Sequence, residues 1–213
     1  MASYTPAELS YLLAGRDTAS AGFAREALGL VELAEGDEGV TAGAQALVSS
    51  GRAHIENGEM KLSEEAMFIG YTLGTATDWL RVSIQTEKPE EGIASVAMAF
   101  VGSEPGEPAV AAQVLPLGLV QFGIVEPTTT IAEGAVRLIE GYLGAYDTLA
   151  VALQRDHDGV ESSIGFARGQ GKPLRVLHRR EVPGHTDLAD EAGENAEVPA
   201  VIAQVRALVG TRS

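Results

Sequence analysis

The stretch DWLRVSIQT, Asp78–Thr86, marks the point at which the hydrophobic pattern of the chain changes. Its apolar residues alternate with polar ones, and this period of two predicts a half-buried β-strand. Upstream of it, apolar residues recur at the three- and four-residue spacing of helices. The change predicts an α+β fold, with a helical lobe over residues 1–77 and a strand-rich lobe over residues 78–213, packed together as one compact unit.

The strand-rich lobe is expected to form a mostly antiparallel sheet of six or seven strands. The number depends on the residues around Pro116, where VAAQVLP and GLVQFGIVEP form either two strands or one bent strand. Two covering helices are expected on one face of this sheet. The first begins at the capping-box pair Thr130 and Glu133, and the second runs over Val198–Val209. The expected strands are DWLRVSIQT, GIASVAMAFVG, VAAQVLP, GLVQFGIVEP, DTLAVALQRD, GVESSIGFAR and PLRVLHRREV.

The helical lobe is expected to contain four helices. Thr5 and Pro6 are typical of the N-cap and first turn of a helix, and Gly15 ends that helix. The other three helices are expected over about Ala19–Leu30, over about Val40–Ser50 and after the N-cap residue Ser63.

Between the third and fourth helices, His54–Lys61 predicts a two-stranded hairpin. It turns at Asn57 and Gly58, a dipeptide that favours a two-residue turn. A helix, a hairpin and a second helix in this order are typical of the reading helix and wing of DNA-binding proteins. We therefore expect a winged-helix-like N-terminal lobe.

The charge of this lobe argues against DNA binding. Residues 1–80 contain four basic and twelve acidic residues, a formal net charge of −8. The expected reading helix, VTAGAQALVSS, contains no Lys or Arg, whereas affinity for the DNA backbone comes from cations placed against phosphates. We expect no nucleic-acid partner, and we interpret the lobe as a scaffold or a protein-binding surface.

The whole chain is acidic and free of cysteine. Its 213 residues carry 30 acidic and 15 basic side chains, a formal net charge of −15, which disfavours phosphate polymers and anionic membranes. The absence of Cys excludes disulfides, thiolate metal centres and thiol catalysis. No apolar run approaches the roughly 20 residues that span a bilayer, and no basic segment precedes the first apolar stretch. We expect a cytoplasmic protein with no membrane partner.

The densest group of candidate catalytic residues is RDHDG, Arg155–Gly159. Asp156, His157 and Asp158 could ligate a metal ion, but consecutive residues of a strand point to opposite faces. A polar hairpin turn is the favoured interpretation. The serine-nucleophile pattern G-x-S-x-G is absent, and GQGK lacks the length and the hydroxyl residue of a phosphate-binding loop. We therefore expect no enzymatic activity, no bound metal and no cofactor.

Five of the fifteen cations fall within thirteen residues of the last third of the chain. On an exposed strand they would keep the strand soluble and prevent edge-to-edge pairing. Alternatively, they would bind an anion or an acidic peptide, including the chain's own acidic segment 187–197. In a strand, Arg175 and Arg179 would share a face, with Arg168 across the hairpin from them. The candidate binding residues are Arg168, Lys172, Arg175, Arg179 and Arg180.

The order of elements resembles a known family. A small helical lobe is followed by Gly51, Gly58 and the sequence LSEE at 62–65, then by a strand meander and the helix IAEGAVRLIEGYL. Over Ala7–Leu143 the chain is similar to one half of the EspG-type chaperones of actinobacterial type VII (ESX) secretion, which are acidic cytosolic proteins with two pseudo-symmetric halves. The resemblance implies binding of helical secretion substrates, and two paired copies would rebuild the two-half arrangement. The last third holds no second helical lobe, so no binding residue is transferred.

These observations predict a non-catalytic, cytoplasmic, protein-binding or chaperone-like protein. Its partner would be another protein such as a secretion substrate, bound through an apolar sheet face or groove, and the chain would form a homodimer. Two alternatives stay open. One is a winged-helix-type regulator that senses a ligand through its C-terminal sheet. The other is a metal-assisted hydrolase that uses Asp156, His157 and Asp158.

Overall fold

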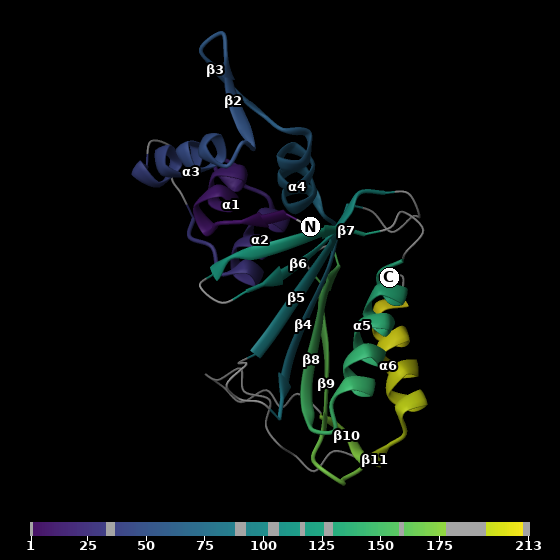
Figure 1. The fold of residues 1–213 in the computed structure, drawn as a ribbon. Helices are drawn as coiled ribbons and strands as arrows, with labels where there is room; N and C mark the ends of the chain where they lie inside the picture. Colours follow the sequence, from purple (N-terminus) through teal and green to yellow (C-terminus); the bar gives the residue numbers. More distant parts are fainter. Residues whose placement is uncertain are drawn as a thin grey trace. The chain divides into compact units, whose positions relative to one another are not determined.

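The computed structural model describes residues 2–32, 37–87, 93–101, 107–115, 118–125, 130–157, 160–177 and 195–210 (Figure 1). Within them the chain forms six helices, a nine-stranded sheet and a two-stranded sheet, which confirms the predicted α+β class. None of these helices is long and apolar enough to cross a membrane. The helices are α1 (Pro6–Leu13), α2 (Ala19–Leu28), α3 (Glu38–Ser49), α4 (Glu64–Thr75), α5 (Ile131–Ala145) and α6 (Val198–Gly210). The strands are β1 (Ala2–Tyr4), β2 (Ala53–Glu56), β3 (Glu59–Leu62), β4 (Asp78–Thr86), β5 (Ile93–Phe100), β6 (Ala109–Val114), β7 (Val120–Ile124), β8 (Leu149–His157), β9 (Val160–Arg168), β10 (Leu174–Leu177) and β11 (Asn195–Ala196).

The large sheet has the strand order β1-β7-β6-β5-β4-β8-β9-β10-β11 and is mostly antiparallel. Seven of its strands are those that the sequence predicts, and β6 and β7 are separate strands paired in register. The predicted number of six or seven was nevertheless too low, because β1 and β11 also join the sheet, one at each edge. These strands are too short for a period of two to be visible in the sequence. Pro116, the expected break, lies outside the described residues.

The chain groups into two compact units. Unit 1 comprises residues 1–78 and 97–127, and unit 2 comprises residues 79–96 and 128–213. The first boundary lies beside the predicted one, but β1, the second half of β5, β6 and β7 group with the helical residues and not with the remaining strands of the sheet. That the two lobes pack as one compact unit stays a prediction.

Each helix of unit 1 begins directly after a capping residue, as predicted for Thr5 and Ser63, and α3 begins at Glu38, two residues before the predicted start at Val40. Each of the four N-cap side chains accepts a hydrogen bond from a backbone N–H in the first helical turn. Gly29 adopts a left-handed conformation, with φ of 64°, and ends α2 two residues before the predicted end at Leu30. The N-cap residues are Thr5, Thr18, Asp37 and Ser63.

Helices α1 and α3 approach each other closely because Gly43 has no side chain. A Cβ atom at Gly43 would lie 2.5 Å from the carbonyl oxygen of Ala7 and 2.7 Å from the Cβ of Tyr11. The approach places Ser50, the C-cap of α3, against Glu8 in the first turn of α1. A single glycine therefore brings the two helix ends together.

Strands β2 and β3 form the predicted hairpin. His54 pairs with Lys61, and the two-residue turn between the strands consists of Asn57 and Gly58. Both turn residues have positive φ, 54° and 81°, as a type I′ turn requires. The hairpin thus lies between α3 and α4, in the order of a wing, while the winged-helix character of the whole lobe stays a prediction.

In unit 2, α5 and α6 lie side by side over one face of the strands β8, β9 and β10 (Figure 1). The helix-facing side chains of β8 alternate with more exposed ones, as the period of two predicts. Leu149, Val151 and Leu153 are among the buried ones, and they pair across the hairpin with Arg168, Phe166 and Ile164. This is the pair of covering helices that the sequence predicts.

Candidate functional site

Arg168, the first of the five predicted binding residues, holds the C-terminal end of α5. Its guanidinium donates to the carbonyl oxygens of Leu143 at 2.8 Å and of Asp147 at 3.1 Å, and also to that of Tyr146. The last turn of a helix leaves such carbonyls without partners, and a cation there complements the helix dipole. Arg168 therefore has a structural role that its sequence context does not indicate.

Arg155 repeats this arrangement at α6. It lies on β8, is only 6% exposed, and donates from Nη1 to the carbonyl oxygen of Leu208 at 3.2 Å. Arg155 and Arg168 lie at opposite ends of the β8–β9 hairpin, since Arg168 pairs with Leu149 at the start of β8. The two helices therefore run antiparallel, and each is held at its C-terminal end by an arginine from the sheet.

The other described members of the basic group, Lys172 and Arg175, are exposed. Arg175 pairs with Ala167, so its side chain and that of Arg168 point to opposite faces of the sheet. The structure therefore does not place Arg168 on one face with Arg175. Binding of an anion or acidic peptide by this group stays a prediction. Outside the described residues lie Arg179, Arg180 and residues 187–194 of the acidic segment.

The predicted metal-ligand triplet lies at the end of β8. Asp156 and His157 are consecutive strand residues, paired with Glu161 and Val160, so their side chains point to opposite faces. Asp158 lies outside the described residues. Among the residues that the structure describes, no three side chains of His, Asp or Glu gather in a way that could hold a metal ion.

The four basic side chains of unit 1 are all engaged within the unit. Unit 1 contains fifteen acidic residues beside these four, a formal net charge of −11, whereas the whole chain carries −15. A DNA-binding surface needs cations that can reach phosphates. The internal contacts run from Arg16 to the Leu12 carbonyl, from Arg25 to the Leu13 and Arg16 carbonyls and Glu32, from Arg52 to Glu8 and the Ser3 carbonyl, and from Lys61 to Glu59.

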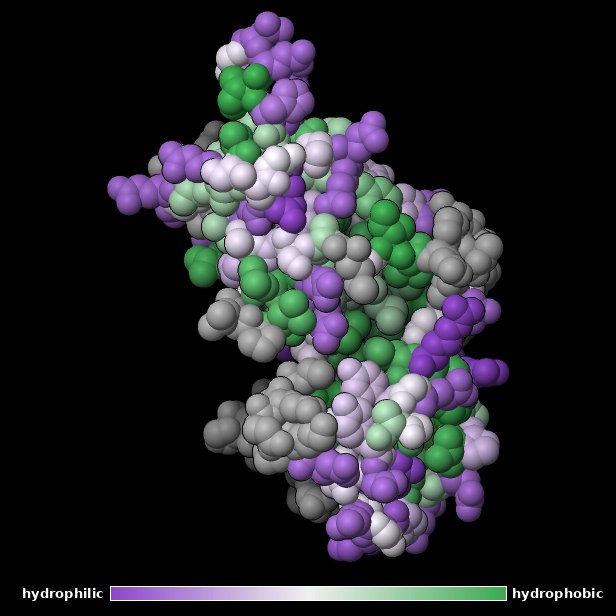
Figure 2. Space-filling model, in the orientation of Figure 1, coloured by the Kyte–Doolittle hydropathy of each residue, from purple (hydrophilic) through white to green (hydrophobic). Residues whose placement is uncertain are grey.

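Unit 1 also contains an open cavity between α4 and the strands β1, β6 and β7, which we name the α4–β7 groove. Its volume is about 340 Å³, within the range of ligand pockets. Figure 2 shows hydrophobic surface in the region where Figure 1 places α4 and β7. Glu65 is the one ionisable residue of the described lining. The main lining residues are Glu65, Phe68, Ile69, Val110, Phe122 and Ile124.

Apolar surface continues outward from this groove. The side chain of Ile124 is 71% exposed, although Val120 and Phe122 on the same strand face are buried. On α4, Met67 and Tyr71 are about half exposed, but with 3.6 residues per turn they lie on a different side of the helix from the groove residues Glu65 and Ile69. Sequence reasoning missed this surface because the alternation in β7 predicts a buried Ile124.

A chain of contacts fixes Glu65 at the groove. The Tyr4 hydroxyl donates to Glu65 Oε1 at 3.0 Å, and the Tyr4 ring lies between the Arg52 guanidinium, 4.2 Å from the ring centroid, and Phe122, 5.6 Å away edge-on. Burial raises the pKa of Tyr4, and the hydrogen bond to Glu65 and its charge raise it further. Tyr4 therefore remains a hydrogen-bond donor at neutral pH.

Arg52 also contacts Glu8, whose side chain is only 2% exposed. Glu8 accepts hydrogen bonds from Ser50 Oγ at 2.6 Å, from the Thr5 N–H at 2.7 Å and from Arg52 Nη1 at 3.1 Å. Burial raises the pKa of Glu8, but the hydrogen bonds from Ser50 and Thr5 and the charge of Arg52 outweigh burial and lower that pKa below 4.5. Glu8 is thus an ionised anchor between α1 and the end of α3.

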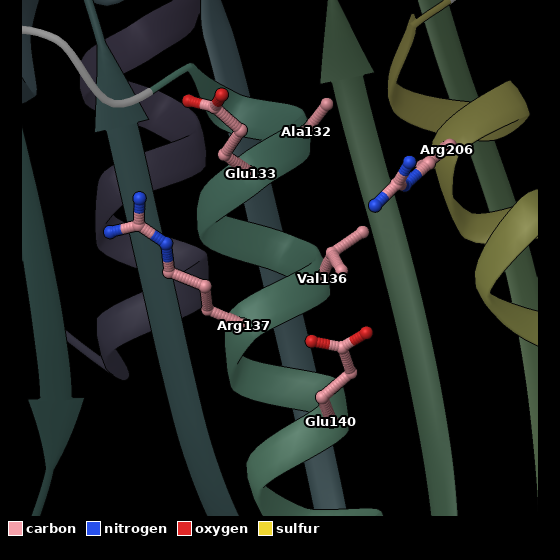
Figure 3. Close-up of a pocket in the computed structure, with 6 residues that line it drawn as sticks. All are labelled: Ala132, Glu133, Val136, Arg137, Glu140 and Arg206. Carbon is pink, nitrogen blue, oxygen red and sulfur yellow. The ribbon is translucent and has the colours of Figure 1, made fainter.

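Unit 2 has a second groove, of about 430 Å³, between α5 and α6 (Figure 3). Arg206 extends from α6 toward α5, whereas Arg137 points away from α6. The Thr130 backbone N–H and hydroxyl, followed by the charges of Arg137 and Arg206, lower the pKa of Glu133. With Glu140 the lining holds two acids and two bases, so it favours neither sign of ligand charge and is the weaker candidate.

No protein-family model matches the chain, and no curated protein matches it. The similarity to EspG-type chaperones stays a prediction.

Proposed function

We propose that this chain is a non-catalytic, cytoplasmic, protein-binding or chaperone-like protein that holds its partner through unit 1. The observation that carries the proposal is the α4–β7 groove, an apolar cavity whose lining includes the exposed side chain of Ile124. Contiguous exposed apolar surface is typical of protein-interaction sites. The partner would bury apolar side chains in the groove, and no covalent chemistry is required.

The resemblance to EspG-type chaperones supplies the proposed partner class, a helical secretion substrate. It also suggests a homodimer, in which two copies rebuild the two-half arrangement of that family. Light scattering coupled to size-exclusion chromatography tests this part. A salt-resistant species of about twice 22.2 kDa is expected, and a monomer at all concentrations and salt conditions would remove the homodimer from the proposal.

The binding function is tested with fluorescein-labelled amphipathic peptides and the full chain. We expect saturable binding by fluorescence anisotropy, and we expect Ile124→Asp to abolish it by placing a charge on the apolar rim. Val160→Asp is the matched control, because Val160 is a similarly exposed strand residue, 64% exposed, that is outside the groove. Equal loss in both variants, or no binding by the parent protein, would contradict the proposal.

A winged-helix-type regulator is the second candidate, favoured by the order α3, hairpin, α4 and by the type I′ turn of the hairpin. The charge of −11 on unit 1 and its internally engaged cations weigh against it. Anisotropy with a labelled duplex at low salt separates the two candidates. Binding that weakens steeply with added salt would favour the regulator.

A further inference from the structure

We infer that the α4–β7 groove prefers a partner segment in which a Lys or Arg lies next to the apolar side chains that enter the groove. The carboxylate of Glu65 would pair with this cation. The inference rests on the proposed function, since it names the chemistry of the partner bound at the same groove. It goes beyond that function because apolar burial alone would not distinguish a basic segment from an acidic or a neutral one.

The described lining of the groove is apolar except for one ionisable residue. Its walls are formed by apolar side chains, with Phe68 and Ile69 on one side and Val110 and Phe122 on the other. Glu65 is the single ionisable residue in this described lining. A site of this kind takes up apolar side chains, while one well-placed polar group sets orientation and specificity.

Glu65 is held in place before any partner binds. One carboxylate oxygen, Oε1, accepts the hydrogen bond from the Tyr4 hydroxyl. Tyr4 is fully buried and is itself fixed by Arg52 and Phe122, which also lines the groove. Pairing of a partner with this carboxylate therefore costs little side-chain entropy at Glu65, and pre-organisation of this kind favours affinity.

The charge of unit 1 favours a cationic partner. Unit 1 has a formal net charge of −11, and each of its four basic side chains already contacts a carboxylate or carbonyl of the same unit. A cationic segment is attracted by this field and an acidic one is repelled. Next to the groove, Glu64 adds a second exposed carboxylate on the first turn of α4.

The test uses three fluorescein-labelled synthetic peptides that share one pattern of Leu residues and carry Lys, Gln or Glu at the remaining positions. Affinity for the full chain is measured by anisotropy at low and moderate salt. We expect the Lys peptide to bind tightest, the Gln peptide more weakly and the Glu peptide least. Glu65→Gln is expected to weaken binding of the Lys peptide about tenfold, as loss of one charged hydrogen bond implies, and to leave the Gln peptide unchanged.

Glu64→Gln is the matched control, since it removes the same charge from the adjacent residue, which does not line the groove. We expect it to change the affinity for the Lys peptide less than about twofold, as one exposed charge at a distance implies. Glu65 is exposed, so Glu65→Gln is expected to fold, and a thermal melt verifies this.

The outcomes separate the two proposals. If all three peptides bind equally and Glu65→Gln has no effect, the cation preference is wrong while the protein-binding function stands. The same holds if Glu64→Gln weakens the Lys peptide as much as Glu65→Gln does, because the effect is then a general field and not recognition by Glu65. If no peptide binds, both proposals fail.

Discussion

Two helices of this protein begin with nearly the same four residues, TPAE at 5–8 in unit 1 and TIAE at 130–133 in unit 2. Both form a capping box, in which the threonine hydroxyl accepts from the backbone of the glutamate and the glutamate accepts from the backbone of the threonine. Both glutamates have a lowered pKa. Their surroundings differ, because Glu8 is buried against Ser50 and Arg52 whereas Glu133 is exposed at the edge of the α5–α6 groove.

The difference shows how one local motif acquires two roles. In unit 2 the capping glutamate serves the first turn of α5. In unit 1 the same motif is extended into a network that reaches α3 through Ser50 and the groove through Arg52, Tyr4 and Glu65. In unit 1 the buried capping glutamate is therefore linked to the candidate groove through other side chains, whereas in unit 2 the exposed capping glutamate itself lines the α5–α6 groove.

The largest expected effect comes from removing the buried capping glutamate, Glu8, and the exposed Glu133 is its comparison. Glu8→Ala is expected to destabilise the protein by about 3 kcal/mol, because it breaks a buried ion pair and two capping hydrogen bonds. Glu133→Ala is expected to lower stability only slightly, because water replaces the lost contacts. Urea denaturation of both variants measures the difference. Equal denaturation midpoints would show that the buried contacts of Glu8 contribute no more to stability than the exposed ones of Glu133.

The next test concerns the close approach of α1 and α3 that buries Glu8. Gly43→Ala is expected to cost about 2 kcal/mol, since the added methyl group meets backbone and forces the helices apart. Gly22→Ala is the control, because Gly22 lies in α2 with open space around it. That change is expected to stabilise the protein by about 1 kcal/mol through helix propensity. In thermal melts, Gly43→Ala is expected to lower the melting temperature and Gly22→Ala to raise it. A change in the same direction in both variants would contradict the role of Gly43 in the approach of α1 and α3.

In unit 2 the contacts at the C-terminal end of α5 are expected to contribute more to stability than the capping glutamate at its N-terminal end. Arg168→Met is expected to destabilise the protein by about 1.5 kcal/mol, because carbonyls at the end of α5 lose a charged donor. Arg175→Met removes the same charge from an exposed position on β10 and is expected to change stability by less than about 0.5 kcal/mol. A comparable loss in both variants, measured by urea denaturation, would mean that the contacts of Arg168 contribute nothing.

The smallest expected effect is a pH dependence. Because the folded-state pKa of Glu8 is lowered, its ionised form stabilises the folded protein above the ordinary pKa of 4.5, and this contribution is lost as pH falls through the folded-state value. The stability difference between the parent protein and Glu8→Gln should therefore be largest at neutral pH and should shrink below about pH 4.5. A difference that stays constant from neutral to acid pH would show that the Glu8 charge makes no contribution.

Local signals in the sequence predicted much of the fold. The N-caps at Thr5, Ser63 and Thr130 and the turn at Asn57-Gly58 are short-range patterns, and the structure contains each of them. The strand Asp78–Thr86 was visible as a period of two because its buried residues Leu80, Val82 and Ile84 alternate with more exposed ones. The edge strands β1 and β11 could not be predicted, since two or three residues do not define a period.

The candidate site could not be predicted from such local signals. The groove forms between α4 and strands β6 and β7, which lie some 40 residues or more further along the chain, and no local pattern indicates that they meet. Arg168 was predicted as a binding residue from its basic neighbours. Its contact with α5 depends on the register of β9 with β8, which places it on the helix-covered face.

By itself, the sequence determined the α+β class, the helix starts after Thr5, Ser63 and Thr130, the hairpin turn at Asn57-Gly58 and the acidic charge, because these depend on neighbouring residues or on composition. The tertiary structure alone decided that Glu8 is buried while Glu133 is exposed, that Arg155 and Arg168 hold helix ends, and that Ile124 is exposed beside a groove. These features depend on which distant surfaces meet, and burial changes the energy of a charge or an apolar side chain far more than its neighbours in sequence do.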